Sequence, residues 1–478
     1  MIRFPQSPFR AWTLWSALAV CILLAPLVEA RPPSIVLVVA DDVGYGDLAC
    51  LGNPIVQTPS LDRFYQESVR FTNFHVSPNS AATRAALLTG RHEFHGGVTH
   101  SAEGRERLRR DAATLAQVLK AAGYATGVFG KWQLGDEEVY QPAQRGFEES
   151  FIHGGSVIGG SGDIAGNSQF NPMLLHNGEF MEALGYSTDG IFRHAVEWMD
   201  DQIDAGKPYF ACILPSAAQP PVCPLEYERF YLRRKVAPEL APLFGMVSNL
   251  DDNFGQLLAK LQEWGSEENT LVIFLTDHGG TAGVQTFNAG MHGGAGTPYE
   301  GGTRVPSFWR WPGQWKAGAD VAALTAHLDL FPTLAQIAEA QIPPGAAAQL
   351  EGRDLLPLLH DATHAWPDRL LFTHVGGWAH GLAAQSSHAG SAVRDERFSL
   401  VNNAELYDLQ TDPGQAHNVF DGHPEEVEKL RKAYERWWKE IQPDLINEDA
   451  VAPPTNFFQE RFRKQFAEDP APAIPGAK

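Results

Sequence analysis

The sequence predicts an α/β fold in which a mostly parallel central sheet is flanked by helices and followed by a small C-terminal α+β subdomain. Three observations lead to this prediction. Continuous apolar, β-branched runs recur along the chain, which is typical of strands buried on both faces of a parallel sheet. Segments with helical spacing lie between these runs, as parallel connections require. Towards the C-terminus, short strand-like pieces replace this alternation.

The expected elements follow one another in α/β order. The strands are predicted at 34–40, 125–129, 209–214 and 270–275. One helix is predicted between them at 111–123, where a glycine gives a C-terminal stop signal, and another at 251–264. Functional side chains in such folds lie at the carboxyl ends of the strands, so these ends are where a site is expected.

The chain divides into four predicted parts. Residues 1–30 are expected to be a signal peptide, 31–362 the α/β domain, 363–450 the α+β subdomain and 451–478 a flexible tail. The subdomain prediction depends on strand-like pieces at 398–401 and 405–409 and on one amphipathic helix. The residues expected on the apolar face of that helix are Val427, Leu430, Tyr434, Trp437 and Ile441. The last part is rich in proline, alanine and charged residues, which is typical of a loosely held end.

The N-terminal segment has the pattern of an export signal. Arg3 and Arg10 make it basic, an apolar run follows, and Val28-Glu29-Ala30 forms a small-x-small cleavage site. A retained membrane anchor is the other interpretation, but the run is short for a span and Pro26 interrupts it. We therefore expect an exported protein, periplasmic or extracellular, with no stable membrane span after cleavage.

The net charge excludes some classes of function, and the cysteines leave one structural question open. The formal net charge is −20 at pH 7, which argues against a general nucleic-acid or anionic-membrane binder. An anionic substrate would therefore need local positive groups. Cys212 and Cys223 flank a proline-rich loop, and both a disulfide between them and two buried free thiols stay open.

Acidic side chains follow two of the predicted strands directly. Asp41 and Asp42 come after the first strand, and Asp277 and His278 come after the strand at 270–275. Adjacent carboxylates repel each other unless a cation lies between them, and oxygen ligands favour Ca²⁺ or Mg²⁺. A solvated turn or a helix cap would explain one such pair, but two pairs at strand ends indicate a metal site.

The stretch S-P-N-S-A-A-T-R-A-A-L-L-T-G-R, residues 77–91, places Ser80 at the start of a predicted helix. The N–H groups at a helix N-terminus favour an anion, and Arg84, one turn further, would support a developing negative charge. The other interpretation is that Ser80 only caps the helix.

Six ordered blocks give the chain a family resemblance. A-D-D-V-G-Y-G-D-L-A-C-L-G-N-P resembles the opening motif of the sulfatase family, and S-A-A-T-R-A-A-L-L-T-G-R resembles its signature, Cys or Ser, x, Pro or Ala, x, Arg, then L-T-G-R. G-K-W-Q-L-G, L-T-D-H-G, P-Y-E-G-G-T-R-V-P and E-L-Y-D-L-Q-T-D-P-G are similar to later family blocks. The resemblance covers residues 33 to 441 and implies the fold shared by sulfatases and alkaline phosphatases.

The resemblance also implies a chemistry. In the family, the signature Cys or Ser is converted to formylglycine, whose hydrate attacks the sulfur of a sulfate ester beside a divalent ion, usually Ca²⁺. By position, Ser80 would be the formylglycine precursor, Arg84 its support and Lys131 a sulfate contact. The implied metal ligands are Asp41, Asp42, Asp277 and His278. The implied partners are a sulfated small molecule or glycan and a maturation enzyme.

Several positions depart from the family pattern. Ser80 stands where Cys is commonest, and His278 stands where Asn or His is usual. The motif histidines are replaced by Gln133 and Gln219, and a sulfate-binding lysine is replaced by Ala295. Glutamine donates a hydrogen bond but is no general acid near neutral pH. We expect Gln133 and Gln219 to contact substrate. Of the nearby histidines, His92 and His95 are interpreted as surface or supporting residues, and His292 as a candidate substrate contact.

Three functional hypotheses follow. The first is an exported, Ca²⁺-dependent sulfatase acting on an aryl or carbohydrate sulfate. The second is a catalytically impaired homologue that binds a sulfated glycan or a protein partner, because Gln133, Gln219 and Ala295 weaken the pocket. The third is a metal-dependent phosphoester or phosphonate hydrolase in which Ser80 attacks directly.

Overall fold

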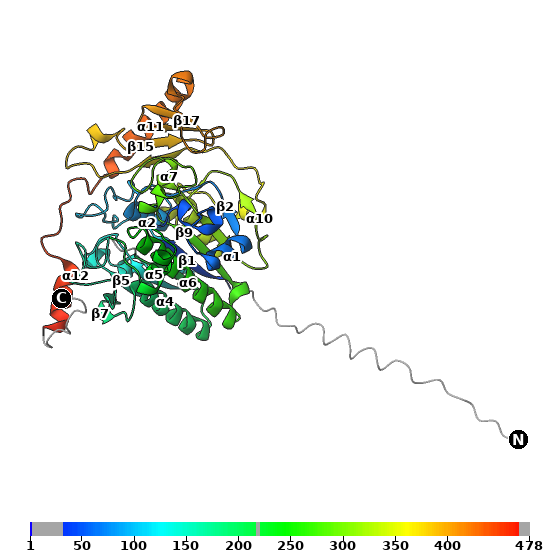
Figure 1. Cartoon of the computed structure of the whole chain (residues 1–478), viewed down its shortest axis with the longest axis vertical. Coiled ribbons are helices and arrows are strands. Elements are labelled where there is room, and N and C mark those ends of the chain that lie inside the picture. The colour runs from blue at the N-terminus through cyan, green and yellow to red at the C-terminus, as the bar shows by residue number, and fades with distance from the viewer. Residues whose placement is uncertain (2–31, 217–219, 468–478) are drawn as a thin grey trace.

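A ten-stranded sheet forms the centre of the protein (Figure 1). The computed structural model describes residue 1, residues 32–216 and residues 220–467. Almost all of the expected signal peptide and the whole of Gln219 therefore lie outside the described residues. The strand order of the large sheet is β12-β2-β11-β9-β1-β8-β4-β5-β6-β7.

The middle of this sheet is parallel and contains the predicted strands. They are β1 (Ser34–Ala40), β4 (Ala125–Lys131), β8 (Tyr209–Leu214) and β9 (Thr270–Thr276), joined by β5 (Glu149–His153). Strand β1 pairs in parallel with β8 and β9, and β4 pairs in parallel with β8 and β5. The predicted fold class is confirmed, and the continuous apolar runs are explained because all of these parallel strands except the first residue of β5 are buried.

Shorter strands complete the sheet at both sides. One side carries β11 (Ser307–Arg310), β2 (Val69–Phe71) and β12 (Asp320–Val321), and the other carries β6 (Met173–His176) and β7 (Glu179–Glu182). A separate three-stranded sheet has the order β10 (Arg304–Val305), β3 (Phe74–His75), β13 (Thr325–Ala326).

Two apolar clusters cover the two faces of the sheet. Alternate residues of β1 belong to different clusters, with Leu37 in one and Val38 in the other. The Val38 face is covered by α1 (Pro59–Glu67), α4 (Ser187–Asp204), α5 (Leu225–Arg233) and α6 (Ala241–Glu263). The Leu37 face is covered by α2 (Ser80–Thr89), α3 (Leu115–Ala121), α8 (Leu330–Ile337) and α10 (Leu356–His360). The short helices α7 (Glu300–Thr303) and α9 (Pro344–Ala347) lie in connections.

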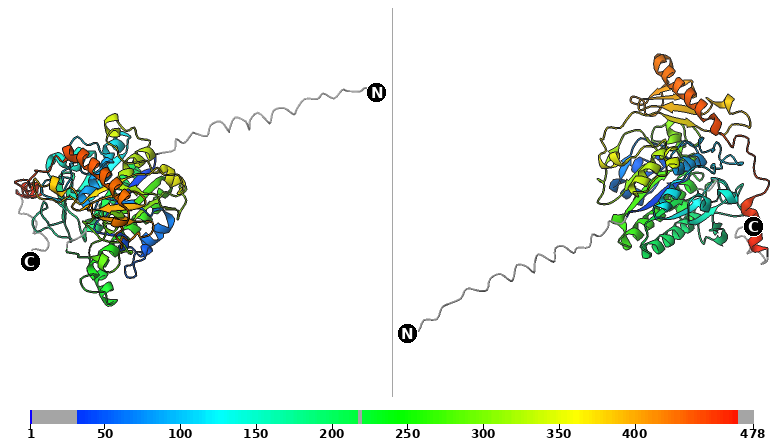
Figure 2. Two further views of the ribbon diagram at one scale, coloured as in Figure 1. Left: turned by 90° about the horizontal axis from the view of Figure 1, so that it is seen from above. Right: turned by 180° about the vertical axis from the view of Figure 1, so that it is seen from behind.

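The C-terminal subdomain lies at one end of the molecule (Figures 1 and 2). Its antiparallel sheet consists of β14 (Leu371–His374), β15 (Ser391–Arg394), β16 (Phe398–Val401) and β17 (Glu405–Asp408), in that order. Helix α11 (Pro424–Ile441) packs on this sheet. Its predicted apolar face is confirmed, because Val427, Leu430, Tyr434, Trp437 and Ile441 are all buried.

The segment predicted to be a flexible tail contains a further helix, α12 (Phe457–Phe466), which corrects that prediction for these residues. The helix returns from the subdomain to the large domain and packs beside β7, where the Phe180 ring contacts the rings of Phe458 and Phe462. Gln465 adds hydrogen bonds to both backbone groups of Phe180. Burial of apolar rings therefore holds α12 against the large domain.

A Phe458→Ala substitution is expected to lower the free energy of unfolding by about 3–5 kcal/mol, because it removes a fully buried ring from the large apolar cluster. Chemical denaturation followed by tryptophan fluorescence measures the change. An Arg463→Ala substitution on the exposed side of the same helix is the control and is expected to cost less than about 0.5 kcal/mol. Equal effects of the two substitutions would contradict the packing role of α12.

Cys212 and Cys223 are both buried free thiols, which settles the two open interpretations against a disulfide. Cys212 lies in β8 within the Leu37-side cluster, whereas Cys223 packs near Gly245 of α6 on the other face of the sheet. The sheet separates the two sulfur atoms. Burial raises the pKa of each thiol to about 12, so both stay protonated and unreactive.

No helix among the described residues is long and apolar enough to cross a bilayer.

Candidate active site

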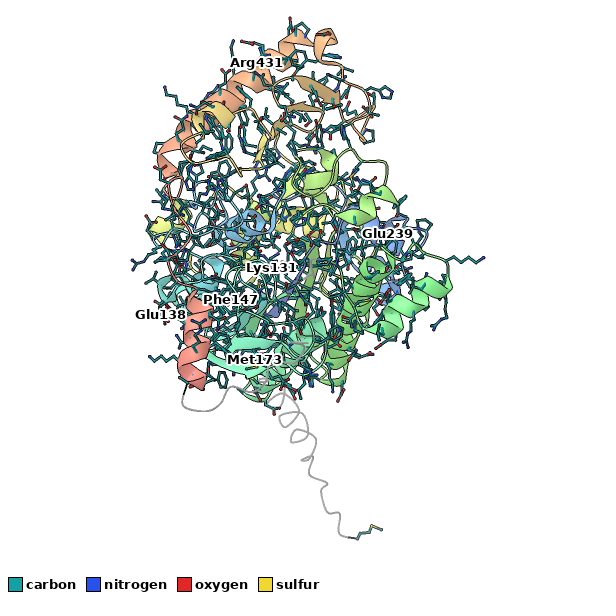
Figure 3. The ribbon with its side chains drawn as sticks, turned by 60° about the vertical axis from the view of Figure 1, so that its left-hand side comes forward. Lys131, Glu138, Phe147, Met173, Glu239 and Arg431 are labelled. Carbon is teal, nitrogen blue, oxygen red and sulfur yellow. The ribbon has the colours of Figure 1, made fainter. Side chains whose placement is uncertain are left out.

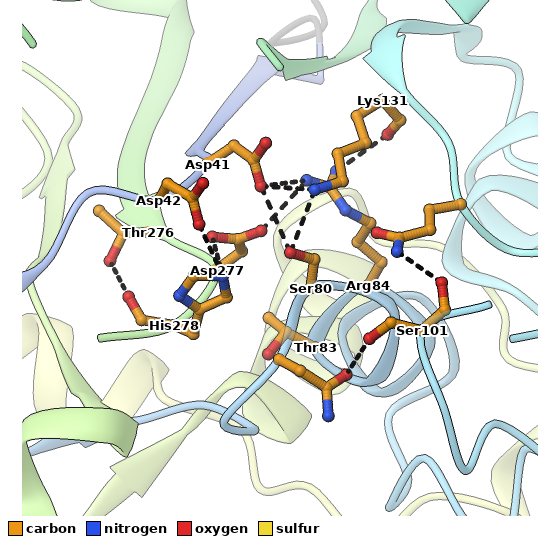
Figure 4. Close-up of polar contacts among 12 residues, drawn as sticks. Asp41, Asp42, Ser80, Thr83, Arg84, Ser101, Lys131, Thr276, Asp277 and His278 are labelled. Carbon is orange, nitrogen blue, oxygen red and sulfur yellow. Dashed lines mark hydrogen bonds and ion pairs between the residues drawn. The ribbon is translucent and has the colours of Figure 1, made fainter. Parts of the chain in front are cut away.

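Four chain segments meet at the carboxyl ends of the parallel strands (Figure 4). Asp41 follows β1, Asp277 follows β9, Lys131 ends β4 and Ser80 begins α2. Their side chains point towards one another, and all four residues are buried. Lys131 lies in the interior of the molecule, between the subdomain helix that carries Arg431 and the edge of the sheet near Met173 (Figure 3). The strand ends named by the sequence therefore converge as expected.

Ser80 presents its hydroxyl group to this centre and does not cap the helix. The N-cap of α2 is Asn79, whose side chain accepts a hydrogen bond from the Ala82 amide at 3.2 Å. The Ser80 Oγ donates to Asp41 Oδ1 at 3.3 Å and accepts from Lys131 Nζ at 3.2 Å. The capping interpretation of Ser80 is therefore wrong. Its hydroxyl group points towards Asp41 and Lys131 instead.

Two buried cations supply the local positive charge that the acidic chain needs. Lys131 Nζ lies 2.7 Å from Asp41 Oδ1. Arg84 Nη2 lies 3.3 Å from Asp277 Oδ2 and 3.8 Å from Asp41 Oδ1, while its Nη1 donates to the Lys131 carbonyl at 2.9 Å. Burial alone would raise the pKa of Asp41, but Lys131 and Arg84 hold it well below its usual range. Both cations are positioned to bind an anion beside Ser80.

The acidic groups form a compact cluster with one histidine. Ligand atoms of Asp41, Asp277 and His278 all lie within 4.8 Å of one another. Asp277 is fully buried, and its Oδ1 atom has no hydrogen-bond partner. Burial, with the negative charge of Asp41, raises the pKa of Asp277 to about 6. A buried carboxylate oxygen without a partner is costly, and a bound cation would satisfy it.

His278 is oriented by its backbone and faces the carboxylates. Its Nδ1 donates to the Gly279 carbonyl at 2.8 Å, which leaves Nε2 at 3.4 Å from Asp42 Oδ1 and 3.7 Å from Asp277 Oδ1. Burial alone would lower the pKa of His278, but Asp277 and Asp42 raise it above its ordinary value. Asp42 has a left-handed backbone, with φ of 58°. These residues fit a divalent cation with mainly oxygen ligands.

The positions that depart from the family pattern have well-defined surroundings. The Gln133 Nε2 donates to the Ser101 carbonyl at 2.9 Å, and its Oε1 is buried without a hydrogen-bond partner. Ala295 lies in a loop beside the site, where its amide donates to the Gly280 carbonyl at 2.9 Å. It contributes no charge there. Gln219 lies outside the described residues.

The other candidate histidines lie elsewhere. His292 is exposed, stacks on Tyr299 with ring centroids 4.0 Å apart and donates from Nδ1 to the Gln415 carbonyl. These contacts direct it towards the C-terminal subdomain, and among the described contacts none joins it to Ser80. His92 is buried beside Glu93, and His95 pairs with Asp444.

One histidine that sequence reasoning missed belongs to the site. His153 ends β5 and pairs in register with Lys131, at the same edge of the sheet. It is buried; its Nδ1 donates to the Gly154 carbonyl at 2.9 Å, and its Nε2 has no hydrogen-bond partner. Burial, with the nearby charge of Lys131, lowers the pKa of His153 to about 4. The sequence signal for His153 is weak, because only Phe151 and Ile152 precede it as an apolar stretch.

Comparison with known proteins identifies the family. The family model described as Sulfatase matches residues 33–340. The chain belongs to the sulfatase family. A second model, described as N-sulphoglucosamine sulphohydrolase, C-terminal, matches residues 297–442. Human arylsulfatase A is 32% identical, over 86% of this chain and 88% of that protein.

Solved structures agree with this assignment at the level of the fold. The sulfatase fold is shared with Ps i-CgsB in complex with k-i-k-neocarrahexaose, with a TM-score of 0.77 and 24% identity over 91% of this chain and 98% of that one. It is also shared with BT4656 in complex with its substrate D-glucosamine-2-N,6-O-disulfate, with a TM-score of 0.66 and 21% identity over 87% of this chain and 99% of that one. The sulfatase homologues of this chain are sulfuric ester hydrolases.

Proposed function

We propose that this sulfatase-family protein is an exported hydrolase that cleaves an aryl or carbohydrate sulfate ester. The observation that carries the proposal is the position of the Ser80 Oγ, 3.2 Å from Lys131 Nζ at a helix N-terminus and beside the buried acidic cluster. In this proposal Ser80 is the precursor of formylglycine, which a maturation enzyme would form. The cation is Ca²⁺, with Mg²⁺ as the second choice, held by Asp41, Asp42, Asp277 and His278.

The chain's own residues then bind and orient the sulfate group. When present, the hydrated formylglycine supplies an oxygen nucleophile and the cation polarises the sulfate oxygens. Lys131 and Arg84 hold negative charge at the same point, and charge-assisted hydrogen bonds from buried cations are strong. The N-terminal amides of α2 add positive potential. The substrate is a sulfated small molecule or glycan, as the sugar disulfate bound by the structural neighbour BT4656 suggests by analogy.

His153 takes the role of proton acceptor in this pocket. Its Nδ1 donates to the Gly154 carbonyl, so Nε2, which has no hydrogen-bond partner, keeps a lone pair that can accept a proton from a hydroxyl group. Because burial lowers the pKa of His153 to about 4, the ring is neutral above that pH and suits a base. Gln133 provides no proton transfer, so a good leaving group, such as a phenol, favours the reaction.

A His153→Asn variant is expected to reduce kcat/KM for an aryl sulfate by about 10²-fold or more, because general base catalysis is lost. In the unaltered enzyme, kcat/KM should rise with pH through a pKa near 4 as His153 loses its proton, and this acidic limb should disappear in the variant. Stopped assays between pH 3 and pH 8 measure both effects. Exposed His364 offers a control, since His364→Asn should leave rate and profile unchanged. An unaltered acidic limb in His153→Asn would refute the assignment.

The experiment that tests the proposed function is mass spectrometry of the tryptic peptide 71–84 from protein purified from its host. Formylglycine at Ser80 would lower the peptide mass by two hydrogens and give aldehyde reactivity. An unmodified serine in every copy would overturn the formylglycine mechanism.

A non-catalytic binder of sulfated glycans or a protein partner is the second candidate. Ala295 contributes no charge beside the site, and the Gln133 amide nitrogen is engaged by a backbone carbonyl. Lys131 and Arg84 would still bind an anionic group. Turnover of any sulfate ester by the purified protein would exclude this candidate.

A phosphoester hydrolase that uses Ser80 directly is less favoured. Two-metal phosphohydrolases need two adjoining ligand sets. Within the described residues, the single ligand cluster found at this edge of the sheet is that of Asp41, Asp277 and His278.

A further inference from the structure

A second group of ligand-type side chains lies at the opposite end of β5. Glu149 is the first residue of β5, His176 is the last residue of β6 and His194 lies in α4. Their ligand atoms lie within 4.8 Å of one another. Glu149 lies four positions before His153, about 13 Å away along an extended strand. This group is therefore separate from the active site.

Both imidazole rings direct the same nitrogen at one carboxylate oxygen. Glu149 Oε1 lies 2.7 Å from His176 Nε2 and 3.1 Å from His194 Nε2. Tetrahedral zinc with bonds of about 2 Å holds its ligand atoms about 3.3 Å apart. The observed spacing is close to this value, so small side-chain shifts would admit an ion between the three atoms.

Neighbouring residues fix the three side chains in place. The Phe151 ring stacks on His194, with ring centroids 4.2 Å apart, and meets His176 edge-on at 6.1 Å. Asn177 Nδ2 donates to Glu149 Oε2 at 2.9 Å, which holds the second carboxylate oxygen. Ligands oriented by packing and by outer hydrogen bonds lose little freedom on binding a metal.

We propose that Glu149, His176 and His194 form a zinc site, which goes beyond the proposed hydrolase function. Two imidazole nitrogens and one carboxylate oxygen are a ligand set typical of Zn²⁺ rather than Ca²⁺. The side chains are 15%, 34% and 18% exposed for Glu149, His176 and His194, so an ion enters from solvent and water completes the fourth position.

Binding replaces the hydrogen bonds among these three side chains with bonds to the metal. In the bound form each ring carries a proton on Nδ1 and gives its Nε2 lone pair to Zn²⁺, in place of the contact between Nε2 and Glu149. The ion then links β5, the β6–β7 hairpin and α4. Strands β5, β6 and β7 form one side of the large sheet, so the expected consequence is a more stable fold at that edge.

Calorimetric titration of the chelator-treated mature chain with ZnCl₂ tests the site, with saturating Ca²⁺ present to occupy the catalytic cluster. We expect one Zn²⁺ per chain and a higher melting temperature with Zn²⁺. Glu149→Gln and His194→Phe should each weaken binding by about 100-fold or more, since each removes a ligand. The phenylalanine keeps the stacking on Phe151, and His176→Gln serves if either variant fails to fold.

Two further variants separate this site from other sources of zinc binding. Asp277→Asn alters the catalytic cluster and should leave the zinc stoichiometry at one. His364→Phe replaces an exposed histidine elsewhere and should leave the affinity unchanged. The proposal is overturned if wild-type protein shows no zinc binding at about 100 μM, a concentration at which three-ligand sites of this chemistry are occupied. It is also overturned if binding survives in Glu149→Gln and His194→Phe, or disappears in Asp277→Asn.

Discussion

A Ser80→Ala variant will lose sulfate ester hydrolysis by a factor of about 10⁵ or more while keeping its fold. In the proposed function this loss follows because Ser80 is the precursor of the attacking group, and its oxygen is hydrogen-bonded to Lys131 and Asp41. The fold is kept because Asn79 caps the helix and alanine retains the buried Cβ atom. The measurement is kcat/KM with an aryl sulfate and with sugar sulfates, alongside the melting temperature.

Ser101→Ala provides the matched control for this prediction. The Ser101 hydroxyl donates to Asn79 Oδ1 at 3.4 Å and lies next to the site without contacting Ser80. It should keep activity within a few-fold. A Ser80→Ala enzyme that retained a tenth of the wild-type rate would show that the reaction does not proceed through this residue.

Calcium should raise the melting temperature of the unaltered protein, and Asp277→Asn should abolish both this shift and the activity. A ligand at 100 times its Kd stabilises a fold by about 2.7 kcal/mol. For a domain of this size that corresponds to a shift of about 3–4 °C. The physical reason is that the ion relieves the repulsion between Asp41 and Asp277 and satisfies the partnerless Asp277 Oδ1.

The same experiment shows whether the effect is specific to the cluster. Without calcium, Asp277→Asn should be no less stable than wild type, because burial raises the pKa of Asp277 to about 6 and an amide removes that cost at neutral pH. Asp251 is a buried aspartate elsewhere, whose oxygens accept the Ser60 and Leu61 amides. Asp251→Asn should lower stability yet keep the calcium shift. A calcium shift that persisted in Asp277→Asn would place the ion somewhere else.

The sequence predicted the parallel core because its strands are buried on both faces and contain little except apolar residues. Helix α12 was missed for the opposite reason. Phe458, Phe462 and Phe466 recur at a spacing of four residues, but prolines before and after this stretch indicate a loose tail. Contacts with Phe180 of β7, far away in the sequence, explain why the segment is ordered.

The sequence was sufficient to predict those site residues whose positions depend on backbone topology alone. Asp41 and Asp277 follow neighbouring parallel strands, so their convergence requires no knowledge of side-chain orientation. His153 required such knowledge, because its place in the site depends on the Gly154 carbonyl that holds its ring. His292 is the opposite case. It lies close in the sequence to Ala295, a position of the family pattern, yet it does not lie beside Ser80.

Because α12 packs against the large domain, part of that domain stays uncovered until α12 has been synthesised. The Phe180 ring contacts Phe458 and Phe462, which follow it in the sequence by more than 270 residues. At about 5–20 residues per second, ribosomal synthesis takes more than about ten seconds between these two parts. During that interval the Phe180 side of the nascent domain stays exposed, so α12 must be synthesised before this edge of the sheet is covered.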